Sequence, residues 1–181
     1  MVHRCQTGRC QAILACTIAA HQGASFEESL RLFRDLHDRW GVATTLGCLG
    51  FMAVAEGSLE EAETAYDESL AWFREHGDDA GVAAALSSLG GLATLRGDLD
   101  RAEELLRESL EVTQKTRDRW GTARSLAHLA RIAMLRGEDR DAADLYRRGL
   151  RGLGTVGDAP HPTACPVRQV ARLTYRQPSR C

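Results

Sequence analysis

The sequence predicts an all-α protein, a right-handed α-solenoid of tandem helix-turn-helix repeats. The first observation behind this prediction is a repeat with a period of 40 residues, in which the tetrad Asp-Arg-Trp-Gly at 38–41 returns intact at 118–121. The second is the spacing of apolar residues within each repeat, which follows the period of an α-helix. Because a repeated helix pair cannot bury its apolar stripe alone, neighbouring pairs must stack.

The period divides the chain into a solenoid and two flanking segments. Gly23 lies seven residues before Leu30, whereas Gly57 lies thirteen residues before Leu70, so the first unit has a shortened second helix. After Leu150 glycines and prolines replace the pattern, as is typical of a flexible segment. The predicted parts are an N-terminal segment with a partial first helix at 1–23, a solenoid at 24–153 with a truncated first unit and then units at about 38–77, 78–117 and 118–153, and a flexible basic tail containing Pro, Arg and Cys at 154–181.

The limits of each helix follow from capping residues. Asp78 can cap the first helix of the middle unit by accepting backbone N–H groups, and Gly97 ends that helix. The second helix begins at Asp98, and in the preceding unit at Ser58, where the residues Ser-Leu-Glu-Glu at 58–61 have the form of a capping box. The other units repeat these signals 40 residues earlier or later.

Small residues at fixed points indicate close packing of the helices. Gly50, Gly90 and Ala130 lie in the middle of first helices, where glycine costs up to ~1 kcal/mol relative to alanine, so another helix is expected to approach closely. The three tryptophans are expected to pack between units: Trp40, Trp72 and Trp120.

Three sets of residues occupy equivalent positions: Leu49, Gly50, Gly57, Ala62 and Tyr66; Leu89, Gly90, Gly97, Ala102 and Leu106; Leu129, Ala130, Gly137, Ala142 and Tyr146. Each set places a Leu-Gly or Leu-Ala pair in the first helix, a small residue after the turn, and a large apolar residue four positions later. This pattern resembles that of the tetratricopeptide repeat (TPR) family. The common repeat is ~34 residues long, and the longer form here resembles the TPR regions of bacterial signal-transduction ATPases and LuxR-class transcriptional regulators.

The resemblance implies a non-enzymatic protein-protein interaction module, with a regulatory or signalling role, that binds a protein segment on the concave face of the stack. In the family this face is lined by the first helix of each unit. Carried over by position, the lining residues are Thr44, Gly47, Phe51, Val54, Ala55, Ala84, Ser87, Gly91, Thr94, Leu95, Arg124, Ala127, Arg131, Met134 and Leu135. The partner-binding candidates are Thr44, Phe51, Val54, Ser87, Thr94, Arg124, His128, Arg131 and Met134.

Three of these candidates suggest the character of the partner. Arg124, His128 and Arg131 recur at helical spacing, and together they would hold an acidic segment. The alternative is that the two arginines are solvated surface residues and that His128 packs between helices.

A second function stays open beside peptide binding. The solenoid ends without an obvious capping helix, so the apolar stripe of Leu145, Tyr146 and Leu150 would stay partly open. Burying this stripe against a second copy would make a homo-oligomer. The chain would then be a self-assembly arm or a fragment of a larger transcriptional regulator.

No residue pattern predicts catalysis, a cofactor or a metal site. The paired carboxylates recur with the repeat, and several lie in first helical turns, where the helix dipole favours them. The candidate metal ligands are scattered over both ends of the chain without the close pairing of zinc sites: His3, Cys5, Cys10, His161 and Cys165. Phosphate-binding glycine loops and hydrolase motifs are absent from the sequence.

Composition excludes other classes. The chain has 181 residues, of which 44% are apolar, and its net charge of −2 gives no general reason to expect nucleic acid or a membrane surface. The longest apolar run is too short to cross a bilayer. No cysteine lies between 49 and 164, unlike the disulfide framework of a secreted domain, so free thiols and a cytoplasmic location are expected.

The two ends of the chain raise two further alternatives. Arg4 and Arg9 precede an apolar stretch as in a signal peptide, but polar residues stand where such a peptide needs an apolar core. Residues 140–181 carry eight arginines against three aspartates, a basic balance that would suit nucleic acid or an acidic partner. Nucleic-acid binding is not expected, because Tyr175 is the only aromatic residue of the tail.

Overall fold

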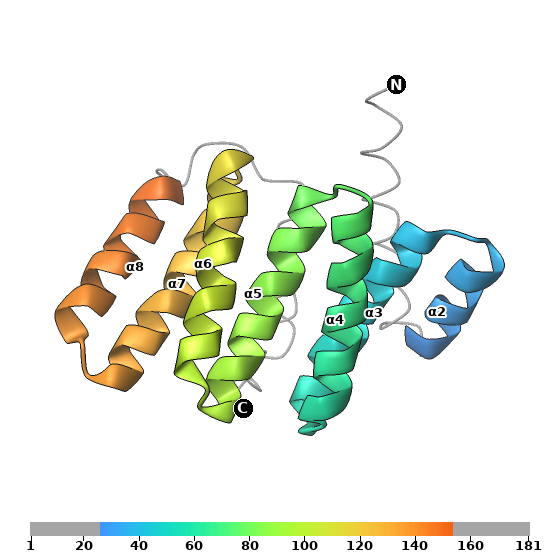
Figure 1. Ribbon diagram of the computed structural model, residues 1–181, viewed down its shortest axis with the longest axis horizontal. Helices are drawn as coiled ribbons and strands as arrows, with labels where there is room; N and C mark the ends of the chain where they lie inside the picture. The colour runs from blue at the N-terminus through green and yellow to red at the C-terminus, as the bar shows by residue number, and fades with distance from the viewer. Residues whose placement is uncertain (1–25, 154–181) are drawn as a thin grey trace, which may run out of the picture.

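The computed structural model describes residues 26–153, which form α-helices joined by short turns, with no strand in that range. The described helices are α2 (Phe26–Asp35), α3 (Arg39–Glu56), α4 (Leu59–Glu75), α5 (Asp79–Arg96), α6 (Leu99–Lys115), α7 (Arg119–Arg136) and α8 (Asp139–Leu153). Figure 1 shows them in one row, from α2 at the right to α8 at the left. The predicted all-α solenoid is confirmed. The segments predicted at 1–23 and 154–181 lie outside the described residues.

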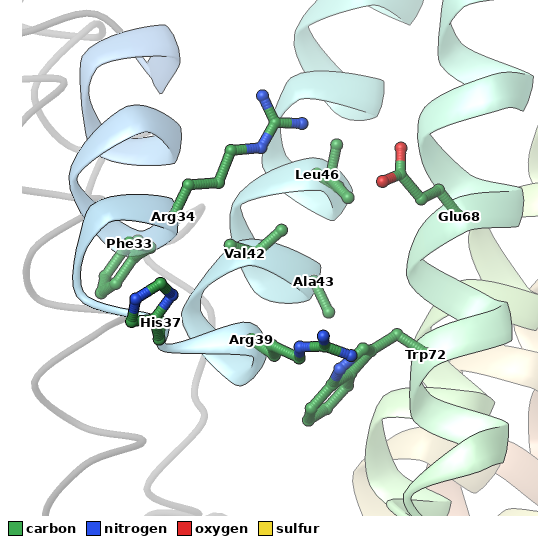
Figure 2. Close-up of a pocket in the computed structure, with 9 residues that line it drawn as sticks. All are labelled: Phe33, Arg34, His37, Arg39, Val42, Ala43, Leu46, Glu68 and Trp72. Carbon is green, nitrogen blue, oxygen red and sulfur yellow. The ribbon is translucent and has the colours of Figure 1, made fainter.

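The helices form stacked pairs, and the two members of each pair differ in what they contact. The pairs are α3 with α4, α5 with α6, and α7 with α8, and α2 packs against α3 at the N-terminal end (Figures 1 and 2). The first helices of neighbouring pairs also touch, α3 with α5 and α5 with α7. Among the described helices, the second members α2, α4, α6 and α8 do not contact one another. The first helices therefore converge on an inner face, and the second helices spread apart on the outer face.

Aspartate and glycine set the limits of the first helices, as predicted. Asp38, Asp78 and Asp118 each accept a hydrogen bond from the backbone N–H three residues later, at 3.0 to 3.1 Å. At the other end Gly57, Gly97 and Gly137 adopt φ near +80° and close the helix with backbone bonds. The predicted capping box at Ser58 is wrong, because the Ser58 side chain makes no hydrogen bond to the backbone of α4.

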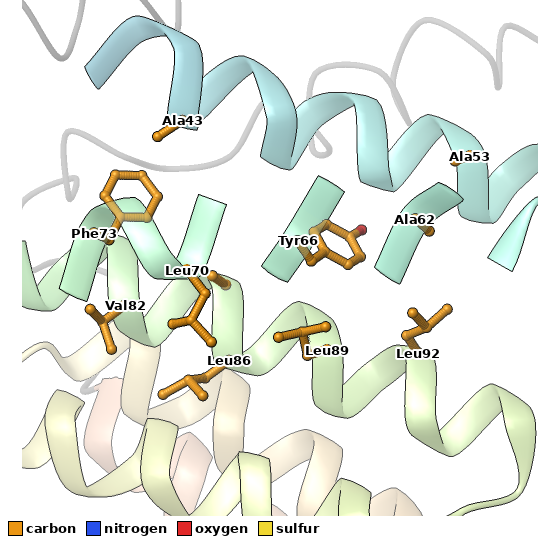
Figure 3. Packing of buried hydrophobic residues seen from close by; sticks show 11 residues of the cluster. Ala43, Ala53, Ala62, Tyr66, Leu70, Phe73, Val82, Leu86, Leu89 and Leu92 are labelled. Atoms are coloured by element: carbon orange, nitrogen blue, oxygen red, sulfur yellow. The ribbon is translucent and has the colours of Figure 1, made fainter. Parts of the chain in front are cut away.

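Glycines in mid-helix allow the two helices of a pair to come close. A Cβ added at Gly50 would lie 2.6 Å from the ring of Tyr66, and one at Gly90 would lie 2.6 Å from Leu106. Figure 3 shows the resulting core, in which side chains of α4 such as Tyr66 and Phe73 fill the space between α3 and α5. The close packing predicted from these glycines is confirmed.

Buried serines tie the second helix of a pair to the first. Ser69 Oγ donates to the backbone carbonyl of Ala43 at 2.8 Å, and 40 residues later Ser109 Oγ donates to the carbonyl of Ala83 at 2.9 Å. Both serine side chains are fully buried. The next position in the series is Gly149, which has no side chain to offer. The third pair therefore lacks a hydrogen bond that the first two possess.

Ion pairs join neighbouring units at the ends of the first helices. Arg96 of α5 pairs with Glu63 of α4, and Arg136 of α7 pairs with Glu103 of α6 in the next unit. The hydrogen bond from the arginine is the largest influence on each carboxyl group, and it holds the pKa of Glu63 and of Glu103 below the ordinary value. These pairs repeat at the period of the sequence, so they help to fix the register of the units.

The three tryptophans differ in how far neighbouring residues cover them. Trp40 Nε1 donates to Asp78 Oδ2 of the next unit at 3.0 Å, which confirms that it packs between units. Trp72 stacks on His76 with a centroid distance of 4.1 Å and lines a cavity together with residues of α2 and α3. Trp120 is half exposed, contrary to the prediction, because no described helix follows α8 to cover it.

The last helix leaves part of its apolar stripe open. Leu150 is 68% exposed, whereas Leu70, its equivalent in α4, is 6% exposed because α5 covers it. Tyr146 is exposed as well, and Leu145 is half-buried. Within the described residues, the open stripe expected from the sequence is present.

Candidate binding surface

The inner face is built from α3, α5 and α7, the helices that touch across the units. Seven of the nine candidate residues have at least part of their side chain at the surface. Phe51, Arg124, Arg131 and Met134 are exposed, and Thr44, Val54 and His128 are half-buried. The seven candidates with surface-accessible side chains all lie on α3 and α7.

Ser87 and Thr94 do not belong to that surface, which corrects the sequence-based selection. Both lie in α5 and are buried, with exposed fractions of 2% and 6%. The reason is that α5 lies between α3 and α7 and contacts both. Each of those two helices contacts only one other first helix among the described residues. Thr94 Oγ1 donates to the carbonyl of Gly90 at 2.8 Å, a bond within its own helix.

Exposed apolar side chains gather near the C-terminal ends of the first helices. Phe51 and Met134 are joined by Leu95 and Leu135, which the positional assignment also placed on this face, and all four are exposed. Met52 is exposed too and was not predicted. Its equivalents Leu92 and Ile132 are buried against residues of the preceding unit. Whether such a residue is buried depends on the neighbouring helices, and the position within the repeat does not predict this.

The basic residues of the inner face lie on α7. Arg124 and Arg131 are exposed and lie outside the apolar core. His128 between them is half-buried, and its ring lies where a Cβ added to Gly91 of α5 would meet it at 3.5 Å. This position agrees with the alternative in which His128 packs between helices.

Burial determines the protonation of this histidine. Desolvation lowers the pKa of His128 below its ordinary value, and the positive charges of Arg124 and Arg131 lower it further. The imidazole is therefore neutral at neutral pH. The positive charges that flank His128 on this face of α7 are those of Arg124 and Arg131.

A separate cavity of about 290 Å³ lies on the other side of α3, between α2 and α4 (Figure 2). Its lining residues come from all three helices and include three basic side chains and one carboxylate. They are Phe33, Arg34, His37, Arg39, Val42, Ala43, Leu46, Glu68 and Trp72. No local pattern in the sequence predicts this cavity, because its walls come from segments that are up to 39 residues apart.

A second hollow of about 240 Å³ between α4, α5 and α6 has a different character. Two carboxylates line it: Glu63 is bound by Arg96 and Arg101, and Asp98 caps α6 by accepting the Arg101 N–H at 3.2 Å. The charged groups that line this hollow are therefore bound to one another within the described residues, unlike those of the first cavity.

The described residues contain no group of three or more potential metal ligands. The histidines and cysteines singled out at the two ends of the chain lie outside 26–153. Cys48, in α3, is half-buried. None of the helices between Phe26 and Leu153 is both long and apolar enough to cross a membrane.

Stacked helix pairs with converging first helices define the class, an α-helical repeat solenoid with an open inner face. A family model for the tetratricopeptide repeat matches residues 41–115 and again 81–153, and the second match begins 40 residues after the first. Together these matches cover most of the chain. The protein belongs to the tetratricopeptide repeat family, as the sequence pattern suggested.

One solved structure similar to this chain is the crystal structure of BtubC (BKLC) from P. vanneervenii. The TM-score is 0.58 and the identity is 23%, over 86% of this chain and 61% of that chain. At this identity the likeness concerns the fold alone, and the chain spans less than two thirds of that protein. A comparison with curated protein sequences found no match.

Proposed function

We propose that this protein is a non-enzymatic interaction module that binds an acidic polypeptide segment with apolar side chains on its inner face. Tetratricopeptide repeats generally mediate protein-protein interaction, and they are typically non-catalytic. The observation that carries the proposal is the combination of exposed Phe51 and Met134 with exposed Arg124 and Arg131 on helices that share one face.

The chemistry of this face defines the partner. Exposed apolar side chains at the ends of α3, α5 and α7 would bury apolar residues of a bound segment, at roughly 25 cal/mol per Å² of apolar area removed from water. Arg124 and Arg131 would bind carboxylates, since a guanidinium can donate two parallel hydrogen bonds to one carboxylate group. A segment with carboxylates near one end and apolar residues near the other fits both features.

A peptide-display selection tests the proposal. The full chain is used as bait against random peptides, and the selected peptides are then bound to the variant Arg124→Glu/Arg131→Glu. The matched control is Arg147→Glu/Arg148→Glu on α8, which changes the net charge equally away from the inner face. We expect selected peptides rich in Asp, Glu and apolar residues whose binding the first variant abolishes and the control retains. Equal binding to both variants would contradict the proposal.

The long repeat and its resemblance to regulatory TPR regions support a regulatory or signalling role in the cytoplasm. In that setting the chain acts as a stand-alone adaptor or as part of a larger regulator. The proposal includes no cofactor, no nucleic acid and no membrane.

The open stripe on α8 favours self-assembly as a second candidate function. Leu150 and Tyr146 are exposed where their equivalents in α4 are covered by the next helix. Light scattering of the full chain over a range of concentrations tests this candidate, with Leu150→Gln as the variant. A dimer that the substitution dissociates supports self-assembly, and a concentration-independent monomer contradicts it.

A further inference from the structure

The cavity between α2 and α4 differs from the equivalent places in the other units. One unit later, Arg74 of α4 pairs with Glu108 of α6 at 2.6 Å and so joins the two helices that correspond to α2 and α4. The residues 40 positions earlier are Arg34 and Glu68, which face the cavity from opposite walls (Figure 2). Within residues 26–153 neither of these side chains makes an ion pair or hydrogen bond. The ion pair that joins α4 to α6 therefore has no counterpart between α2 and α4 among the described residues.

A second position of the repeat shows the same contrast. In the third unit Arg119 Nε donates to the backbone carbonyl of Gly152 at 2.5 Å. The residues 80 positions earlier are Arg39 and Trp72, and there the Trp72 carbonyl accepts from the backbone N–H of His76 at 3.1 Å. Figure 2 shows the Arg39 guanidinium reaching across the base of the cavity toward this indole. The Arg39 side chain has no acceptor among the described residues.

Trp72 adds a buried donor at the same place. Its Nε1 is shielded from solvent and has no hydrogen-bond partner in the described part of the chain. A buried N–H group without an acceptor costs free energy, and such groups are rare in folded proteins. The buried indole N–H and the exposed Arg39 guanidinium, which lie beside each other in Figure 2, are therefore two donors with no acceptor among the described residues.

Away from Arg39 and Trp72, the cavity is lined by apolar side chains of α3 and by one carboxylate of α4. Val42 and Leu46 form the floor between α2 and α4, and Glu68 lies on the Leu46 side, away from Arg39 (Figure 2). The volume of about 290 Å³ lies at the small end of the range for ligand sites. A ligand of this size is one compact group rather than an extended molecule.

We propose that this cavity binds a carboxylate carried on a compact apolar body. The carboxylate would accept hydrogen bonds from Arg39 and, after a rotation of that exposed side chain, from Trp72 Nε1. The apolar body would lie on Val42 and Leu46, and the carboxylate of Glu68 keeps the ligand's own carboxylate at the Arg39 end. Arg34 and Glu68 can then pair above the ligand, as Arg74 and Glu108 do one unit later. This site is independent of the inner face.

Two sources carry this chemistry, a free small organic acid and the C-terminal residue of a polypeptide. The test uses the ¹⁵N-labelled full chain, whose three indole N–H resonances are assigned by replacing each tryptophan with phenylalanine. Phenylacetate is titrated, with phenylacetamide as the neutral control. The peptide Gly-Gly-Phe and its C-terminal amide form the second arm, and tighter binding of the free peptide than of phenylacetate assigns the site to a chain terminus.

We expect phenylacetate to shift the Trp72 indole resonance saturably and to leave those of Trp40 and Trp120 unchanged. Arg39→Gln should weaken this binding roughly tenfold or more, because it removes a charged hydrogen-bond donor. The matched control Arg119→Gln changes the equivalent position of the third unit and should leave the affinity unchanged. A Trp72 resonance that does not move, an equal response to phenylacetamide, or an equal loss in both arginine variants would overturn the proposal.

Discussion

Gly149→Ser should restore the hydrogen bond that the third helix pair lacks. Ser69 and Ser109, at the equivalent positions of α4 and α6, donate to first-helix carbonyls at 2.8 and 2.9 Å. A Cβ added at Gly149 would lie 3.4 Å from the carbonyl oxygen of Ala123 and 3.6 Å from Leu126, which is ordinary contact. A serine therefore fits at position 149, and its hydroxyl would be close enough to donate to the carbonyl oxygen of Ala123, which is the equivalent of Ala43 and Ala83.

The expected gain has two parts that can be separated. Replacing a mid-helix glycine by alanine contributes up to ~1 kcal/mol to stability, and serine contributes about 0.5 kcal/mol less than alanine. A buried hydrogen bond adds ~1 kcal/mol. The free energy of unfolding of Gly149→Ser should therefore exceed that of Gly149→Ala by about 0.5 kcal/mol, although alanine has the higher helix propensity.

The assay is urea unfolding of the full chain, followed by far-UV circular dichroism. The matched control is Gly152, also in α8, where an added Cβ meets nothing within 4 Å. There alanine should be at least as stable as serine, because no acceptor is in reach. If alanine were as stable as serine at position 149 as well, the serine bonds would not stabilise the helix pairs and the reasoning would be refuted.

Three further predictions concern packing, turns and charge. Gly90→Ala should lower the free energy of unfolding by about 1–3 kcal/mol, because the new methyl group would lie 2.6 Å from Leu106; urea unfolding measures this loss. Arg117→Gly should raise the unfolding free energy by about 0.5–1 kcal/mol in the same assay, since the residue adopts a φ of +57° that glycine tolerates better. Arg136 lowers the pKa of Glu103, so the stability from this pair is present above the ordinary carboxyl pKa and is lost as pH falls through the lowered value; Glu103→Gln should cost about 1 kcal/mol or less at pH 7 and nothing in strong acid.

The helices could be predicted from the sequence because their limits are local. A capping aspartate such as Asp78 and a turn glycine such as Gly97 act within a few residues, so their spacing alone locates the ends of α5. The 40-residue period then carries the same limits to the other units. Ser58 is an exception, because it has the sequence of a capping box but its side chain makes no cap hydrogen bond.

The binding surface could be predicted only in part, because exposure depends on neighbours. A repeat register treats α3, α5 and α7 alike, and so it placed Ser87 and Thr94 beside Phe51 and Met134. The middle helix has partners on both sides, and these bury its candidates. The cavity beside Trp72 could not be foreseen at all, since it depends on an ion pair that one unit forms and another does not.

Hydrogen exchange with a bound peptide tests the central proposal most directly. A peptide selected for binding is added to the full chain, and amide protection is compared between the first helices and the second helices. Binding on the inner face predicts added protection in α3, α5 and α7, greatest near Phe51, Arg131 and Met134. Added protection confined to α4, α6 and α8 would contradict the proposal.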